Sequence, residues 1–146
     1  MNKMSDLDIA ITHLYNKELT LAIAKNGKII FQTDSHRISG FIFAIDTLGV
    51  QLNGASVADK VAGKALALLC IYAGICEVYA EILSKNAEVL FEENGITFQC
   101  KHLVDNILDL KKTNICPFEK AAVDITDPSV SYAVFKDLLA KMKFCK

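Results

Sequence analysis

Apolar residues recur at helical spacing near both ends of the chain. Residues 5–15 place their apolar positions on one face behind Ser5, a favoured N-cap residue, and predict an amphipathic helix. Residues 35–48 repeat apolar side chains at i, i+3, i+4 and i+7 before Gly49, which predicts a second helix. A last amphipathic helix is predicted from Asp127-Pro128, with a lysine-rich end that suits the helix dipole at Lys141, Lys143 and Lys146.

Between the first two helices lie two β-prone runs, residues 19–24 and 28–31. The linking residues include Asn26-Gly27, and an Asn-Gly pair between two such runs is the strongest short hairpin signal. The sequence therefore predicts an antiparallel hairpin.

A strand, a helix and a second strand are predicted in the middle of the chain. Residues 77–83 alternate in polarity, residues 86–93 form a helical pattern that ends at Asn94-Gly95, and residues 96–100 are again β-prone. This length suits one right-handed crossover unit, so we expect the two strands to be parallel. Residues 50–52 are a candidate for one more short strand.

The most hydrophobic helix is predicted within residues 53–72, around which the rest of the chain is organised. Ser56 and Asp59 match a capping box, which predicts a helix beginning at Val57. Residues 65–72 are all apolar, so the far end of this core helix is expected to be buried and its polar beginning to lie at a solvent-accessible mouth.

The segment between the second predicted crossover strand and the last helix is expected to contain two more helices. Residues 103–110 carry apolar residues at helical spacing, followed by a polar loop over residues 111–114. Pro117 suits a first helical position, and Glu119 is placed to reach back to the start of that helix. The whole order predicts a three-layer α/β/α sandwich with a mixed sheet of about four to five strands.

Composition limits the class of protein. With 146 residues, 52% of them hydrophobic, the chain is predicted to be a single domain, residues 1–146. The 16 basic and 17 acidic residues nearly cancel, so we expect no nucleic-acid partner. Without a signal peptide or a membrane-length apolar run, a cytoplasmic protein with no membrane partner is expected. The five cysteines are odd in number and form no CxxC pair, which is typical of reduced thiols.

Four segments carry a family resemblance: LTLAIAKNGKIIF, GASVADKVAGKALALL, VYAEILS and CPFEK. They resemble a family of short, uncharacterised prokaryotic proteins of unknown function with a cytidine-deaminase-like fold. The resemblance covers roughly residues 14–127. It implies a mixed sheet that begins with the hairpin and a core helix lying across one face.

Active deaminases of this fold hold zinc through a His or Cys at the start of the core helix and through P-C-x-x-C at the next crossover helix. The corresponding blocks here are Ala58-Asp59-Lys60 and residues 84–88, which contain neither histidine nor cysteine. A catalytic zinc site needs three protein ligands. We therefore expect no metal, no cofactor and no zinc-dependent deamination.

Lys60 and Lys64 are four residues apart and would share one face at the start of the predicted core helix. An anion bound between these lysines and the backbone amides of Gly54, Ala55 and Ser56, with Asp59 nearby, would explain cations at that end of a helix. The alternative is a pair of solvated lysines with Asp59 as a local counter-ion.

Cys116 stands at the predicted N-cap of the helix opened by Pro117, where amides and the helix dipole favour a thiolate. It is the candidate nucleophile, with Glu119 as a candidate proton carrier. The alternatives are that Cys116 is a small buried residue and Glu119 a structural cap.

Three functions follow from these residues. The first is a binding module for a small anionic or nucleotide-like metabolite at the start of the core helix. The second is a zinc-independent enzyme that uses Cys116 as nucleophile, with a lysine stabilising charge. The third is an oligomerising domain, supported by the apolar core helix and by the pairing through sheet-packed helices that the family resemblance implies.

Overall fold

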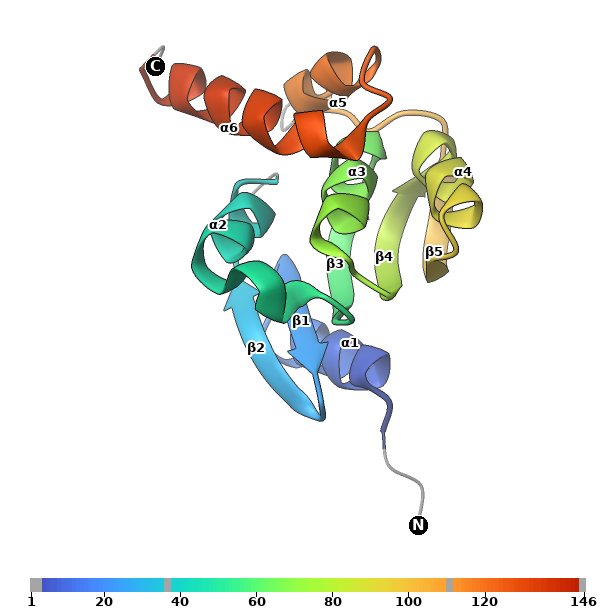
Figure 1. Cartoon of the computed structure of the whole chain (residues 1–146). Coiled ribbons are helices and arrows are strands. Elements are labelled where there is room, and N and C mark those ends of the chain that lie inside the picture. The colour runs from blue at the N-terminus through green and yellow to red at the C-terminus, as the bar shows by residue number, and fades with distance from the viewer. Residues whose placement is uncertain (1–3, 36–37, 110–111, 145–146) are drawn as a thin grey trace.

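The computed structural model describes residues 4–35, 38–109 and 112–144. Within these residues one five-stranded mixed sheet has the strand order β2-β1-β3-β4-β5, with helices on both faces (Figure 1). The elements in chain order are α1 (Asp6–Asn16), β1 (Leu21–Lys25), β2 (Lys28–Thr33), α2 (Ser39–Leu48), the short 3-10 helix η1 (Gly49–Leu52), β3 (Ser56–Ala62), α3 (Lys64–Ala73), β4 (Glu77–Ser84), α4 (Lys85–Glu93), β5 (Thr97–Val104), α5 (Pro117–Ala122) and α6 (Pro128–Phe144).

Strand directions divide the sheet into two halves. β1 pairs antiparallel with both β2 and β3, whereas β3, β4 and β5 run parallel. In the parallel half, α3 connects β3 to β4 and α4 connects β4 to β5. Parallel neighbouring strands need such crossover connections. The predicted fold class, the hairpin and the parallel pair are confirmed.

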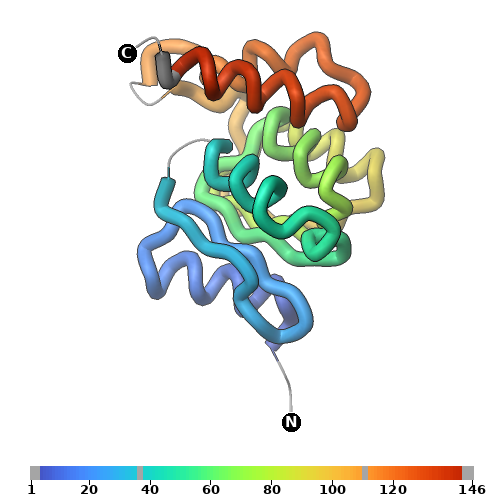
Figure 2. Tube along the Cα trace, turned by 60° about the vertical axis from the view of Figure 1, so that its left-hand side comes forward, coloured from blue at the N-terminus to red at the C-terminus, as the bar shows by residue number. Residues whose placement is uncertain are grey.

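The two faces of the sheet bury separate apolar clusters. α1 covers one face, where Leu7 and Leu14 pack with Ala22, Ala58 and Tyr79. The larger cluster lies on the other face and includes α2, α3 and α4. Figure 2 shows α6 running across the ends of α2 and α3, and α6 packs against both helices. These layers leave α3 almost wholly enclosed.

Local signals account for several element boundaries. The Ser5 side chain accepts a hydrogen bond of 3.1 Å from the backbone N–H of Asp8, as an N-cap should. Asn26 and Gly27 both adopt positive φ, which is the backbone of a tight hairpin turn. Gly74 ends α3 in the left-handed conformation. Sequence patterns predicted the Ser5 cap and the Asn26-Gly27 turn.

The start of the core helix was predicted incorrectly. Residues 56–62 form β3, in the centre of the sheet, and α3 begins only at Lys64. Ser56 and Asp59 make no capping box: the Ser56 hydroxyl donates to Glu77 Oε1 at 3.1 Å, and Asp59 Oδ1 accepts from the backbone N–H of Val61. Ladders to β1 on one side and β4 on the other outweigh the local helix signal.

Two shorter predictions were also wrong. Residues 50–52 belong to η1, not to a strand. The predicted helix over residues 103–110 is replaced by the end of β5, where Leu103 pairs with Leu83, and by a loop in which Leu108 bridges Ile115. Predictions that fall on residues 36–37, 110–111 and 146 lie outside the described residues.

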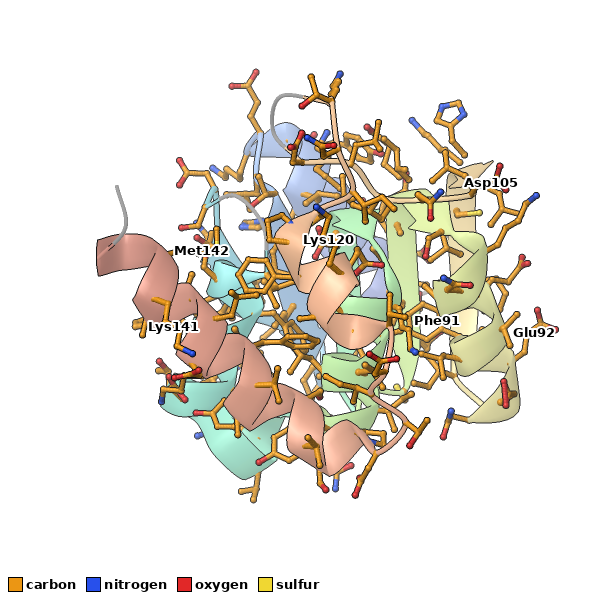
Figure 3. The ribbon with its side chains drawn as sticks, turned by 90° about the horizontal axis from the view of Figure 1, so that it is seen from above. Phe91, Glu92, Asp105, Lys120, Lys141 and Met142 are labelled. Atoms are coloured by element: carbon orange, nitrogen blue, oxygen red, sulfur yellow. The ribbon has the colours of Figure 1, made fainter. Side chains whose placement is uncertain are left out.

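α5 and α6 close the end of the sheet at which the parallel strands finish. Figure 3 looks down on this end and shows α5, marked by Lys120, beside α6 and above the strands. Phe118 of α5 and Phe135 of α6 meet edge to face, with their ring centroids 6.1 Å apart, and both are fully buried. Among the described residues, no helix is long and apolar enough to cross a membrane.

Candidate functional site

A cavity of about 180 Å³ lies where β3 ends and α3 begins. This is the carboxyl edge of the parallel strands, where open α/β sheets usually bind their ligands. Its walls come from five parts of the chain, contributed by Thr20, Ile38, Asp59, Lys60, Val61, Gly63, Leu66, Ile107, Leu108, Asp109, Cys116, Phe118 and Glu119. The fold thus brings the predicted site residues Asp59, Lys60, Cys116 and Glu119 to one cavity.

Glu119 joins α5 to the start of α3. Its two carboxylate oxygens accept hydrogen bonds of 2.8 Å from the backbone N–H groups of Lys64 and Ala65, two of the free amides at the beginning of α3. Gly63 makes this approach available, because a Cβ built there would lie 2.4 Å from Glu119 Cδ. Glu119 was predicted to reach back to its own helix and instead caps a helix more than fifty residues earlier.

The charge state of Glu119 reflects competing effects. Burial raises the pKa of its carboxyl group, while the hydrogen bonds from Ala65 and Lys64 and the charge of Lys64 oppose that rise. Because the carboxylate already occupies the amides of α3, an incoming anion would have to displace it to bind there.

Asp59 is the second carboxyl group of the cavity. Alternation along β3 places it on the same face as Val57, which belongs to the larger core cluster. Asp59 Oδ1 accepts from Val61 N at 3.1 Å. Burial raises the pKa of Asp59 to about 7, against the opposing effect of backbone hydrogen bonds from Val61 and Lys60. The nearby Cys70 is fully buried, and burial together with the Asp59 charge raises the pKa of its thiol.

Lys60 lines the cavity, but its ammonium group lies toward the opposite face of the sheet. Its Nζ is 3.5 Å from Glu81 Oε1 and 4.4 Å from the centre of the Tyr15 ring of α1. The Tyr15 hydroxyl donates to the same Glu81 oxygen at 2.8 Å. Lys60 is thus held by an ion pair and a cation–π contact away from the cavity.

The other predicted anion ligands are spread over the sheet. Lys64 Nζ donates to the carbonyl oxygen of Val123 at 3.1 Å. Gly54 and Ser56 lie at the opposite end of β3, beside the start of β4, where Gly54 N donates to the carbonyl oxygen of Gly74. The structure therefore does not bring Gly54, Ser56, Lys60 and Lys64 together around one anion.

Cys116 is half-buried and lines the cavity at the N-cap of α5. Its backbone N–H donates to the carbonyl oxygen of Ile107 at 2.9 Å, which ties the loop after β5 to the start of α5. Among the described lining residues the thiol is the one soft nucleophile, and it shares the cavity with the carboxyl groups of Asp59, Asp109 and Glu119, which could exchange protons.

Sequence reasoning missed the apolar walls of the cavity and Asp109. Ile107 and Phe118 are buried, and Leu66 belongs to the apolar stretch already identified, so no pattern separated them from ordinary core residues. Thr20 and Ile38 precede β1 and α2 without a recognisable motif. Among the described residues, no three His, Cys, Asp or Glu side chains lie close enough to share a metal ion.

Comparisons with known proteins concern the family and the fold. The family model "TM1506: Domain of unknown function (DUF1893)" matches residues 9–139. A solved DUF1893 family protein (TM1506) from Thermotoga maritima is 24% identical, with a TM-score of 0.80 over 96% of this chain and 92% of that one. No protein of curated function matches the sequence.

A second solved structure is a diaminohydroxyphosphoribosylaminopyrimidine deaminase/5-amino-6-(5-phosphoribosylamino)uracil reductase, also from Thermotoga maritima. It is 21% identical, with a TM-score of 0.46 over 79% of this chain and 39% of that one. This similarity is weak and concerns the fold alone. The family model, in contrast, spans nearly the whole sequence. The chain therefore belongs to the DUF1893 family, which is defined by a domain of unknown function.

Proposed function

We propose that this protein binds a small molecule in the cavity between the end of β3 and the start of α3. The observation that carries the proposal is the meeting of Asp59 of β3 with Cys116 and Glu119 at the start of α5, from two distant parts of the sequence, around one largely apolar cavity. Apolar walls with a few convergent polar groups and perturbed pKa values are typical of ligand sites.

The cavity volume limits the ligand to about one ring. A cavity of roughly 150 Å³ accommodates benzene, and this one measures about 180 Å³. A nucleotide-like ligand would therefore place only its base inside. Its phosphate could be held by Lys60 or Lys64 only if these side chains left Glu81 and the carbonyl oxygen of Val123. This contact pattern favours a ring-sized ligand over an anionic metabolite.

A fragment screen read by backbone amide NMR tests the proposal. Single-ring compounds are expected to shift the resonances of Thr20, Val61 and Ile107, which line the cavity from separate segments. Val61→Phe narrows the cavity and should abolish these shifts. Val89→Phe is the matched control, because Val89 is similarly exposed but lies on α4, outside the cavity. Shifts confined to other surfaces, or none at all, would exclude this binding site.

A second candidate function is thiol chemistry at Cys116, favoured by its position in a cavity that also holds the carboxyl groups of Asp59, Asp109 and Glu119. Iodoacetamide alkylation tests it, because a thiolate displaces iodide and forms a thioether. Cys100 is half-buried too and lies outside the cavity, so it serves as the internal reference. Alkylation of Cys116 near neutral pH no faster than that of Cys100 or of an unstructured cysteine would exclude a nucleophilic role.

An oligomerising role stays a prediction from the sequence. Light scattering after size-exclusion chromatography tests it, since a second copy would double the mass of 16.0 kDa.

A further inference from the structure

The charges around the cavity are unequal. Three lining residues are acidic: Asp59, Asp109 and Glu119. Among the described residues, Lys60 is the one basic residue that lines the cavity, and its ammonium group is engaged with Glu81 and Tyr15 toward the α1 face. The interior of the cavity therefore carries carboxyl groups whose charge the lining lysine does not balance.

Asp59 differs from the other two acids in its partners. Glu119 receives two hydrogen bonds from the start of α3, and Asp109 accepts one from the backbone N–H of Thr113 in its own loop. Asp59 accepts from the adjacent backbone of β3, and none of the ion pairs among the described residues includes it. A carboxylate removed from water without a cation gains strongly when a cation arrives.

The remaining walls are apolar. Ile107 and Phe118 are buried, and Leu66 of α3 completes a surface suited to a flat hydrocarbon ring. We infer that the cavity selects a small organic cation, a ring-sized apolar body carrying one positively charged nitrogen group that pairs with Asp59. This inference rests on the function proposed above and adds the charge of the ligand to it.

Coulombic interactions favour a cationic ligand over an anionic or a neutral ligand of the same shape. An anion of the same shape would approach Asp59 and Glu119 with like charge, and the half-buried setting of both acids weakens solvent screening. A neutral ligand would fill the apolar part and leave the Asp59 carboxylate without a cation. Only a ligand with both an apolar ring and a positive charge would fill the apolar part of the cavity and also pair with the Asp59 carboxylate.

Binding of the cation is coupled to the protonation of Asp59. Among the described residues, the titratable groups on the Asp59 side are Cys70 on α3, and Asp109, Cys116 and Glu119 from the later segments. Lys60 of β3 also lines the cavity, but its ammonium group lies toward the α1 face. Because burial holds the pKa of Asp59 near 7, the carboxylate is the minor form at acidic pH. Cation binding then requires release of its proton, so affinity falls as the pH is lowered.

Three probes of one shape test the inference: benzamidinium, benzamide and benzoate, with charges of about +1, 0 and −1 at about pH 8. Affinities are measured by amide NMR titration. Benzamidinium is expected to bind in the cavity roughly tenfold or more tightly than benzamide, with benzoate weakest, as a desolvated charge pair predicts. Asp59→Asn should remove the preference for benzamidinium and its pH dependence. Asp105→Asn is the control, because Asp105 is exposed and pairs with Lys85 outside the cavity.

Each outcome is decisive. Equal or tighter binding of benzamide or benzoate in the cavity would overturn the cation inference and leave the binding function standing. The same holds if Asp59→Asn keeps the full preference. If none of the three probes shifts the cavity resonances, the cation inference fails, and the fragment screen described above decides separately whether the cavity binds any molecule.

Discussion

The carboxylate of Glu119 accepts a 2.8 Å hydrogen bond from the backbone N–H of Ala65, a residue 54 positions earlier in the chain. A second bond of the same length comes from the N–H of Lys64. The beginning of the most buried helix is thus completed by a side chain from α5, which also helps to line the cavity. Helix capping and cavity architecture therefore depend on one residue.

Glu119→Ala should destabilise the protein by about 1–3 kcal/mol, because it leaves two amides of α3 without their acceptor. Urea unfolding followed by circular dichroism measures this change in the free energy of unfolding. Glu119→Gln keeps one carbonyl oxygen and should cost less. Glu92→Ala, at an exposed position of α4, is the control and should stay within about 0.5 kcal/mol. Equal effects of Glu119→Ala and Glu92→Ala would contradict the capping role.

Gly63→Ala should also destabilise the native state, by roughly 1–3 kcal/mol, because its Cβ would occupy the space of the Glu119 carboxylate. The backbone of Gly63 has φ of −111°, which alanine adopts without strain. In a Glu119→Ala background the same substitution should therefore be nearly neutral or stabilising by about 0.5 kcal/mol. A double-mutant cycle measures the coupling, and additive effects would show that the two residues do not compete for space.

Asp59 should make stability fall as the pH rises toward neutrality. The pKa of Asp59 is about 7 in the folded protein against an ordinary value of 3.8, so between these values the native state binds more protons than the unfolded state. Relative to wild type, Asp59→Asn should gain stability progressively up to about pH 7, by at most about 4 kcal/mol. Unfolding in urea at several pH values measures it, and a difference that is independent of pH would contradict the burial of this carboxyl group.

Lys60→Met should not weaken the binding of a ring-sized ligand in the cavity, because the ammonium group is engaged with Glu81 and Tyr15. The measurement is the same NMR titration, with Lys101→Met as the control for loss of a lysine near the Tyr15 ring. If Lys60→Met alone abolished ligand binding, the original expectation of an anion held by Lys60 would regain support.

Several elements could be predicted from the local pattern, because the residues that give the signal and the residues that form the structure are close together in the sequence. The Ser5 cap, the Asn26-Gly27 turn and the Pro117 start of α5 each depend on residues within a few positions. The alternation in residues 77–83 likewise marks β4, and the helical spacing after Pro128 marks α6. Each prediction concerned neighbours in the sequence.

The errors arose where distant partners outweighed a local signal. Ser56 and Asp59 have the spacing of a capping box, yet β1 and β4 pair with this segment on both sides and make it a strand. Leu103 begins a run of apolar residues at helical spacing, yet it belongs to β5, which pairs with β4. When the partner strands lie tens of residues away, the sequence of the segment that pairs with them carries no local signal of that pairing.

The sequence alone determined the class of fold, most of the helices, the hairpin and four residues of the cavity, Asp59, Lys60, Cys116 and Glu119. Only the tertiary structure decided what each of them faces. Neighbouring residues of β3 point to opposite faces of the sheet, so the Lys60 ammonium group lies toward Tyr15 while Asp59 faces the cavity. Glu119 caps α3 rather than its own helix. Side-chain direction depends on which elements pack on each face of the sheet, and that is a property of the whole fold.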